Sequence, residues 1–289
     1  MIQTLSIDGH QIVAKRLNPM TTLGHPTFLL HGIGGSVDFW SDDQTQIFQE
    51  QGPCYAMSLP GHYPATFPIG FRKEQITATL IVELIAKAIH ELVGDHPVTL
   101  AGLSTGGFTA LALAAQAPQI VSRVISISGF HHGKWSGWLG FFQKLVRGGR
   151  IGQGLFKYIY RRPNLTKVGF NRQWFIYAND IKAMYAYPHF RSATDPSYDN
   201  FMKLDLENMI MYFTVMPNIN IREWLPHISA PMLVIAGDHD PIIPPAQARL
   251  IQKMIPHAEL EMIRGGGHML FAERPLEYQH ALRHWLKHH

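Results

Sequence analysis

The chain has 289 residues, of which 46% are hydrophobic and 11% aromatic, and its formal net charge at pH 7 is +4. These proportions supply a large buried core and exclude a disordered chain. No run of eighteen apolar residues occurs, and residues 1–16 lack the apolar stretch of a signal peptide, so we expect a soluble, cytoplasmic protein.

A single cysteine, Cys54, excludes an intramolecular disulfide and a cysteine-cluster metal site. It falls in an expected buried strand, where a catalytic thiol is not expected. The 17 histidines are scattered and form no His-Glu-x-x-His motif, so no metal site is predicted. We expect the protein to work without a cofactor.

Strands and helices are predicted to alternate along both ends of the chain. Asp8-Gly9 joins two alternating stretches as a hairpin, and a helix over 76–92 ends at Gly94. Further strands are predicted at 27–30, 54–59, 97–102, 121–128, 231–237 and 259–263, and further helices near 246–254 and 275–287. From His131 to about Trp224 the alternation lapses, which indicates an inserted, mainly helical cap. Such alternation favours a parallel sheet with active groups at the carboxyl ends of its strands.

The strongest functional signal is Gly102-Leu103-Ser104-Thr105-Gly106, which lies between a predicted strand and an Ala/Leu-rich helix. Glycines lack a Cβ, so strand and helix can approach closely around a serine in a strained backbone conformation. Ser104 Oγ would then project above the sheet and face the Thr105 N–H at the positive end of the helix.

Two further polar segments follow predicted strand ends and could face Ser104. Asp238-His239-Asp240 follows Gly237, and His268 follows three glycines after Ile263. A serine hydroxyl is a poor nucleophile until a base with a pKa near 7 accepts its proton, and histidine ordinarily titrates at about 6.5. A buried carboxylate would hold the imidazole in the required tautomer.

In this order the motifs resemble the α/β-hydrolase family, with its Gly-x-Ser-x-Gly turn, a His31-Gly32 loop after an early strand, and a late acid and histidine. The resemblance implies an α/β fold with a mostly parallel eight-stranded sheet, helices on both faces and an inserted helical cap. Residues 1–130 and 226–289 would form the core, and residues 131–225 the cap. Ser104 excludes the aspartate nucleophile of the haloalkane dehalogenases and epoxide hydrolases of this fold.

The resemblance also implies roles for individual residues. Ser104 would be the nucleophile, His268 the base and Asp240 the acid, with Asp238 as the alternative acid and His239 as a solvated loop residue. The oxyanion would be bound by the backbone N–H groups of Ile33 and Thr105, with Gly34 as the second choice for the former. His31 is interpreted as a structural histidine that braces this loop.

The cap carries the positive charge of the chain. Residues 131–162 contain seven basic side chains and no Asp or Glu, with aromatic residues between them. Trp138, Phe142 and Leu145 are predicted to form one apolar helix face that resumes at Ile151, Leu155 and Ile159. Either this face packs over the catalytic site, or the cap rests on an anionic membrane surface. Candidate substrate-binding residues are Gly34, His131, Trp135, Trp138 and Met269.

We therefore predict a serine hydrolase that cleaves a carboxylic ester with an apolar acyl or aromatic group through an acyl-enzyme. The alternatives are a monoacylglycerol or lysophospholipid lipase at a membrane surface, another chemistry of the same triad (thioester hydrolysis, C–C bond hydrolysis or peracid formation), and a non-catalytic binding protein. A nucleic-acid partner is not expected, because no nucleic-acid-binding module accompanies the basic segment.

Overall fold

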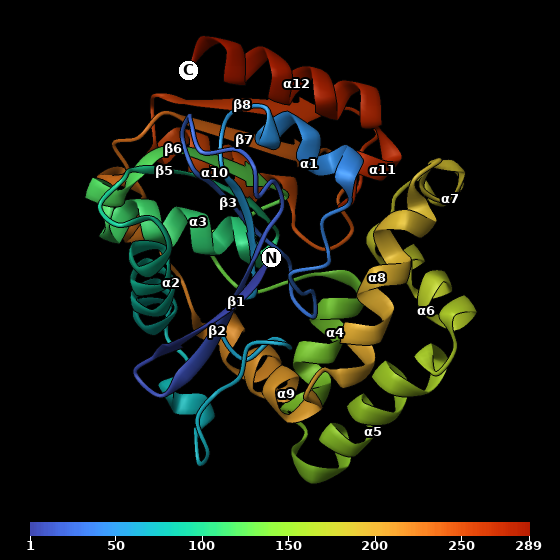
Figure 1. Ribbon diagram of the computed structural model, residues 1–289. Coiled ribbons are helices and arrows are strands. Elements are labelled where there is room, and N and C mark those ends of the chain that lie inside the picture. The colour runs from blue at the N-terminus through green and yellow to red at the C-terminus, as the bar shows by residue number, and fades with distance from the viewer.

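A single eight-stranded sheet organises the chain (Figure 1), in the order β1-β2-β4-β3-β5-β6-β7-β8. The computed structural model describes residues 1–289 apart from the side chains of Ser192 and Ala193. The pairs β1–β2 and β2–β4 are antiparallel and the other pairs are parallel. The strands are β1 Ile2–Ile7, β2 His10–Arg16, β3 Thr27–Leu30, β4 Cys54–Met57, β5 Val98–Leu103, β6 Val121–Ile127, β7 Met232–Gly237 and β8 Ala258–Ile263. The predicted α/β fold with a mostly parallel sheet is confirmed.

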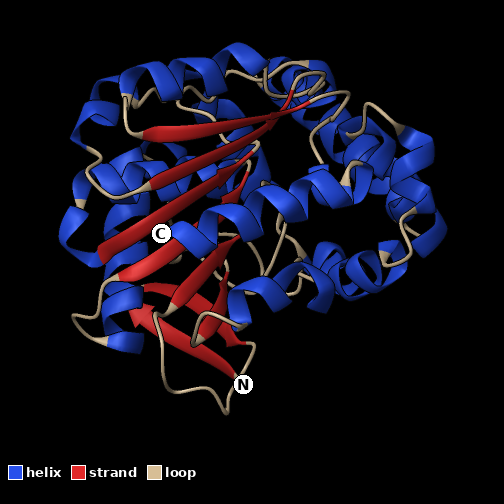
Figure 2. Cartoon of the chain, turned by 90° about the horizontal axis from the view of Figure 1, so that it is seen from above, coloured by secondary structure: helices blue, strands red, loops and turns tan.

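Helices cover both faces of this sheet, which is why its central strands are buried and mostly apolar. In β3, Phe28 and Leu30 belong to one buried cluster and Leu29 to the other. The first cluster packs beneath α2 Ala78–Val93, α3 Thr105–Gln116 and α10 Pro245–Met254, and the second beneath α1 Asp42–Gln49 and α12 Pro275–His288. Figure 2 shows the strands fanned between these two helical layers.

Six α-helices join β6 to β7 and form a lobe beside the sheet (Figures 1 and 2). They are α4 Gly137–Val146, α5 Gly149–Arg161, α6 Lys167–Gln173, α7 Ile181–Ala186, α8 Phe190–Lys203 and α9 Leu206–Val215. Residues 131–225 are called the cap below. The division of the chain into a core and a cap at residues 131 and 225 stays a prediction. In the part of the chain that the structure describes, no helix is long and apolar enough to cross a membrane.

The buried face of α5 differs from the predicted one. Gly152, Phe156 and Tyr160 are buried, whereas Ile151 is 88% exposed and Leu155 45% exposed. The helix turns Phe156 and Tyr160 inward, where their rings fill more of the cap core than Ile151 and Leu155 would, while Tyr158 is 64% exposed. Gly152 allows the close approach to α4, since a Cβ at this position would lie 2.0 Å from the Leu145 carbonyl oxygen.

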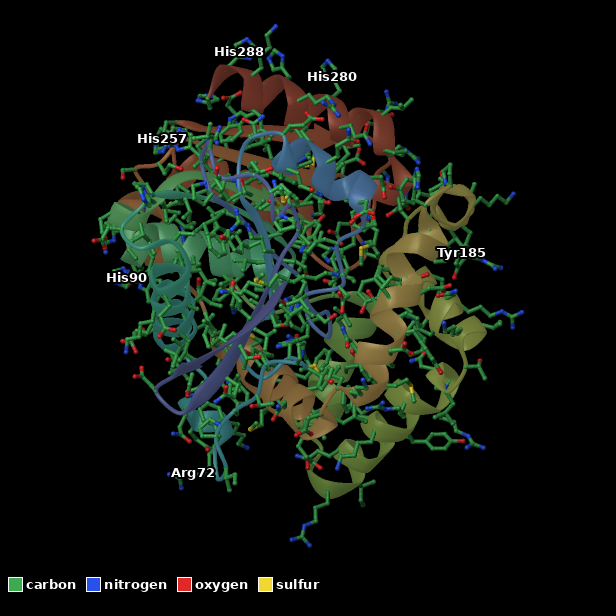
Figure 3. The ribbon with its side chains drawn as sticks, in the orientation of Figure 1. Arg72, His90, Tyr185, His257, His280 and His288 are labelled. Carbon is green, nitrogen blue, oxygen red and sulfur yellow. The ribbon has the colours of Figure 1, made fainter. Side chains whose placement is uncertain are left out.

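The four histidines labelled in Figure 3 lie at the outside of the molecule on three elements: His90 on α2, His257 before β8, and His280 and His288 on α12. Within the described residues, no three or more His, Cys, Asp or Glu side chains are grouped to hold a metal ion. Cys54 is buried in β4, and this burial raises the pKa of its thiol to about 12, so the thiol stays protonated at neutral pH.

Candidate active site

Ser104 occupies the sharp turn between β5 and α3. Its backbone angles, φ 56° and ψ −115°, lie in a region that residues with a Cβ rarely adopt. The neighbouring glycines make this turn possible. A Cβ on Gly102 would lie 2.2 Å from the Gly106 carbonyl oxygen, and a Cβ on Gly106 would lie 2.1 Å from the Leu30 carbonyl oxygen. The sequence therefore places Ser104 at the carboxyl end of a central strand.

His268 and Asp240 meet beside this turn. His268 Nδ1 lies 2.7 Å from Asp240 Oδ2, and the two side chains are 1% and 3% exposed. The other carboxylate oxygen of Asp240 accepts hydrogen bonds from the backbone N–H groups of Ile242 and Ile243 at 2.8 and 2.9 Å. These bonds orient the carboxylate, and the carboxylate in turn leaves Nε2 of the imidazole as the nitrogen that can exchange a proton with a substrate or a serine.

Asp238, the alternative acid, has a different position. Its Oδ1 accepts a hydrogen bond from the Gly265 backbone N–H at 2.6 Å and lies 2.6 Å from His239 Nδ1. The exposed His239 and the backbone bond to Gly265 lower the pKa of the Asp238 carboxyl. Asp238 thus ties together two loops, and the geometry leaves Asp240 as the carboxylate that contacts His268.

The His268 backbone is held from two sides. Its N–H donates to the Tyr177 carbonyl oxygen at 3.0 Å, and its carbonyl oxygen accepts from Ser128 Oγ at 3.0 Å. Ser128 itself has a positive φ of 46° at the end of β6. The histidine is therefore fixed both to the sheet and, through Tyr177, to the cap.

Glu273 makes a further connection that the sequence did not reveal. This buried carboxylate accepts hydrogen bonds from the backbone N–H groups of Asn179, Asp180 and Met269 at 2.9, 2.8 and 3.2 Å. Burial raises the pKa of Glu273, while these backbone bonds act in the opposite direction. No motif marks such a residue, because its partners are backbone groups brought close only by folding.

The loop after β3 supplies backbone donors. The N–H groups of Ile33 and Gly34, and that of Thr105 at the start of α3, donate to no acceptor within the described residues. His31 braces the loop, as expected for a structural histidine: Nδ1 lies 2.7 Å from the Gly32 carbonyl oxygen, and Nε2 accepts from the Leu59 N–H at 3.1 Å. The free N–H groups could bind a negative oxygen, whereas His31 is engaged at both nitrogens.

A cavity of about 50 Å³ joins these parts and is lined by Ser104, His268, Ile33, Gly34 and Met269. Aromatic side chains from the cap close it, at Tyr160, Phe170, Trp174, Tyr177 and Phe201. Ser104 and His268 both line this cavity, and the described chain has no hydrogen bond between Ser104 Oγ and the imidazole.

Three of the residues expected to bind substrate lie outside the described lining of this cavity. His131 is held by Asn220 Oδ1 at 3.3 Å and by Gln247, Trp135 is buried against Phe130 and Phe213, and Trp138 is 44% exposed on the cap. Only Gly34 and Met269 of that set line the cavity. The loop at 131–135 is drawn into the interface between cap and core, so its side chains are used for packing.

The cap is also attached to the loop after β3. Asn200 Nδ2 on α8 donates to Asp38 Oδ2 at 2.7 Å and to Ser36 Oγ at 3.1 Å, and Lys15 Nζ lies 2.7 Å from Asp38 Oδ1. These residues were not predicted as part of the site. They hold the donor loop against the helix that forms one wall of the cavity.

Comparison with known proteins agrees with this architecture. A family model described as "alpha/beta hydrolase fold" matches residues 26–275. Lipase 1 of Psychrobacter immobilis is 25% identical over 282 residues, which cover 93% of this chain and 78% of the lipase. A Pseudomonas syringae pv. syringae (strain B728a) protein provisionally named carbamate hydrolase RutD is 24% identical over 270 residues, which cover 90% of this chain and 93% of that protein.

Among solved structures, the esterase EaEST from Exiguobacterium antarcticum superposes with a TM-score of 0.76. The two chains are 18% identical, and the superposition covers 99% of this chain and 100% of the esterase. At this identity the likeness concerns the fold.

Because two histidines beside the site are buried, we expect the free energy of unfolding to depend on pH. Burial lowers the pKa of His62 from its ordinary value of 6.5 to about 4. Burial also lowers the pKa of His31, to about 3, and the charge of the nearby His62 is a smaller cause of this shift. The unfolded chain therefore binds protons here at a pH where the folded chain does not. Their stabilising effect is complete above pH 6.5 and is lost as the pH falls towards 4 and 3.

The free energy of unfolding of wild type should fall when the pH is lowered from about 7.5 to about 5. In His62→Phe we expect this fall to be smaller by about 2 kcal/mol. A phenyl ring can keep the packing against Tyr212, whose ring centroid lies 4.7 Å away, and cannot be protonated. Urea unfolding at both pH values measures the difference, with His280→Phe on the exposed side of α12 as the control. An unchanged pH dependence in His62→Phe would contradict the assignment.

Proposed function

The chain belongs to the alpha/beta hydrolase fold family, and we propose that it is a serine hydrolase that cleaves a carboxylic ester through an acyl-enzyme. The observation that carries this proposal is the buried 2.7 Å contact between His268 and Asp240, since His268 and Ser104 line the same cavity. A polar pair with 1% and 3% exposed side chains is costly to bury, and a proton relay to Ser104 gives a reason for it.

In the proposed reaction, Ser104 Oγ attacks the carbonyl carbon of the ester and His268 Nε2 accepts the serine proton. The negative charge that develops on the carbonyl oxygen is bound by the N–H groups of Ile33 and Thr105. The C–O bond to the alcohol breaks as His268 returns the proton to the leaving oxygen. Water then attacks the acyl carbon while His268 Nε2 accepts a proton from it. The bond between the acyl carbon and Ser104 Oγ breaks, His268 returns the proton to Oγ, and the acid is released.

The names of the relatives all describe hydrolysis at a carbonyl group, and they differ in the kind of bond that is hydrolysed. They include a lipase, an esterase and a protein provisionally named as a carbamate hydrolase. We place the ester first because cap aromatics line the cavity, and its apolar walls suit an acyl or aromatic group better than a small polar one.

We expect Ser104→Ala to fold as wild type and to lose roughly 10⁶-fold in kcat, because the nucleophile is removed while the turn geometry needs only a small side chain. Hydrolysis of p-nitrophenyl butyrate and labelling by a fluorophosphonate probe measure the loss, and thermal unfolding checks the fold. Comparable labelling of wild type and Ser104→Ala would refute the assignment of the nucleophile.

Asp240→Asn and Asp238→Asn form a matched pair. Asp240→Asn should lower kcat by roughly 10⁴-fold, since an amide cannot stabilise the charged imidazole. Asp238→Asn should keep most of the activity, because an amide oxygen can still accept the Gly265 N–H bond. Steady-state kinetics of both variants decide the point, and the reverse ranking would make Asp238 the acid.

A lipase acting at a membrane surface is the second candidate, and the exposed face of the cap favours it. Most of the exposed large apolar side chains lie between residues 138 and 185, among them Phe141 and Ile151 at the α4–α5 hairpin. Lys144 and Arg150 are exposed at the same hairpin. Apolar side chains beside cationic ones suit the surface of an anionic bilayer.

On this proposal the protein should sediment with vesicles of phosphatidylcholine and phosphatidylserine more strongly than with phosphatidylcholine alone, and salt should weaken the binding. Lys144→Glu/Arg150→Glu should reduce binding markedly, since each basic residue near the surface contributes about 1 kcal/mol. Lys253→Glu, on the exposed side of α10, is the control. Equal binding to both kinds of vesicle would argue against the anionic surface.

A further inference from the structure

A second hollow lies on the cap, next to the catalytic cavity. Its volume is about 320 Å³, and its walls come from α4, α5, α6 and the 3₁₀ turn Trp174–Tyr177. The apolar part of the lining includes Trp138, Phe142, Ile159, Phe175 and Ile176. We call this hollow the outer groove.

The outer groove and the catalytic cavity share two lining residues, Tyr160 and Gln173. The catalytic cavity, at about 50 Å³, is too small for an extended acyl chain, because a single water already requires roughly 10–15 Å³ by the same measure. An ester with more than a few carbons on its acyl side must extend beyond this cavity, and the shared wall is where the neighbouring apolar space begins.

The two residues of this wall are held to different degrees. Tyr160 is packed among aromatic rings, with centroids of Phe156 and Phe201 at 5.0 and 5.5 Å. Gln173 is half-buried, and among the described residues its side chain has one hydrogen bond, from Asn164 Nδ2 to Oε1 at 2.7 Å. Gln173 is therefore the member of the wall that can turn aside with little loss of packing.

From this arrangement we infer that the outer groove binds the acyl chain of a medium- or long-chain carboxylic ester, with Gln173 as the residue that sets chain length. The inference rests on the proposed ester hydrolysis, which places the carbonyl carbon at Ser104. The chain then passes between Tyr160 and Gln173 and lies against Ile159 and Ile176. Its apolar surface is removed from water, which favours binding in proportion to the area covered.

Binding can be tested without catalysis by titrating Ser104→Ala with decanoate, and with acetate as the ligand that lacks a chain. We expect saturable binding of decanoate by calorimetry and at least tenfold weaker binding when Ile159→Trp is added, because the indole would fill the outer groove. Ile69→Trp is the matched control, since Ile69 is fully exposed on a core loop outside both hollows. Equal affinity for decanoate with and without Ile159→Trp would overturn the inference.

Catalysis tests the same groove with one variant that should favour long acyl chains and one that should disfavour them. We expect Gln173→Ala to raise the ratio of kcat/KM for p-nitrophenyl decanoate to that for p-nitrophenyl acetate at least threefold, and Ile159→Trp to lower it at least tenfold, with both esters below the concentration at which they aggregate. A ratio that is unchanged in both variants would refute the groove.

The two proposals can fail separately. If wild type hydrolyses acetate and decanoate esters and neither variant changes the ratio, ester hydrolysis stands and the groove is refuted. If wild type hydrolyses no ester while decanoate binds and Ile159→Trp weakens that binding, the outer groove is supported as an apolar-chain site and the proposed reaction is refuted.

Discussion

The close approach of β5, α3 and β3 is the constraint on which the site depends. Three backbone segments meet where Gly102 faces the Gly106 carbonyl and Gly106 faces the Leu30 carbonyl, at distances that leave no room for a Cβ. This contact forces the turn between them to be sharp, and Ser104 takes up the strain with a positive φ. It also brings the loop after β3 beside the first turn of α3, so that Gly32 lies next to Ser104.

Around this contact, buried and half-buried polar side chains join the core to the cap through hydrogen bonds to backbone N–H groups and to another side chain. Glu273 binds the N–H groups of Asn179 and Asp180 from the cap and of Met269 beside the histidine. Asn200 binds Asp38 on the other side of the cavity. Because the same residues fix the reactive groups and the cavity walls, a movement of the cap would change both the access of a substrate and the position of His268.

On the proposed function, the chemistry of the bond and the choice of substrate belong to different parts of the chain. The reactive groups of the proposed mechanism lie at strand ends of the sheet, where parallel strands bring their loops together. The cap supplies most of the apolar surface around them, first at the small cavity and then at the outer groove. Relatives of similar fold carry names for different substrates, as expected when selectivity depends on such a cap.

The strands, the flanking helices and Ser104 in a sharp turn could be predicted from the amino-acid sequence, because hydrophobic period and glycine-rich turns are local properties. Asp238, Asp240 and His268 could be predicted only as polar residues after strand ends, and the choice of Asp240 as the acid came from the resemblance to a family. Only the tertiary structure decided that Asp240 and not Asp238 contacts His268, since both lie within three residues of Gly237 and either could face it. The wrong face predicted for α5 has the same origin: two apolar faces compete on one helix, and packing against α4 selects the one with Gly152. The wall residues Tyr160 and Gln173 carry no motif, and their position between two hollows exists only in the folded chain.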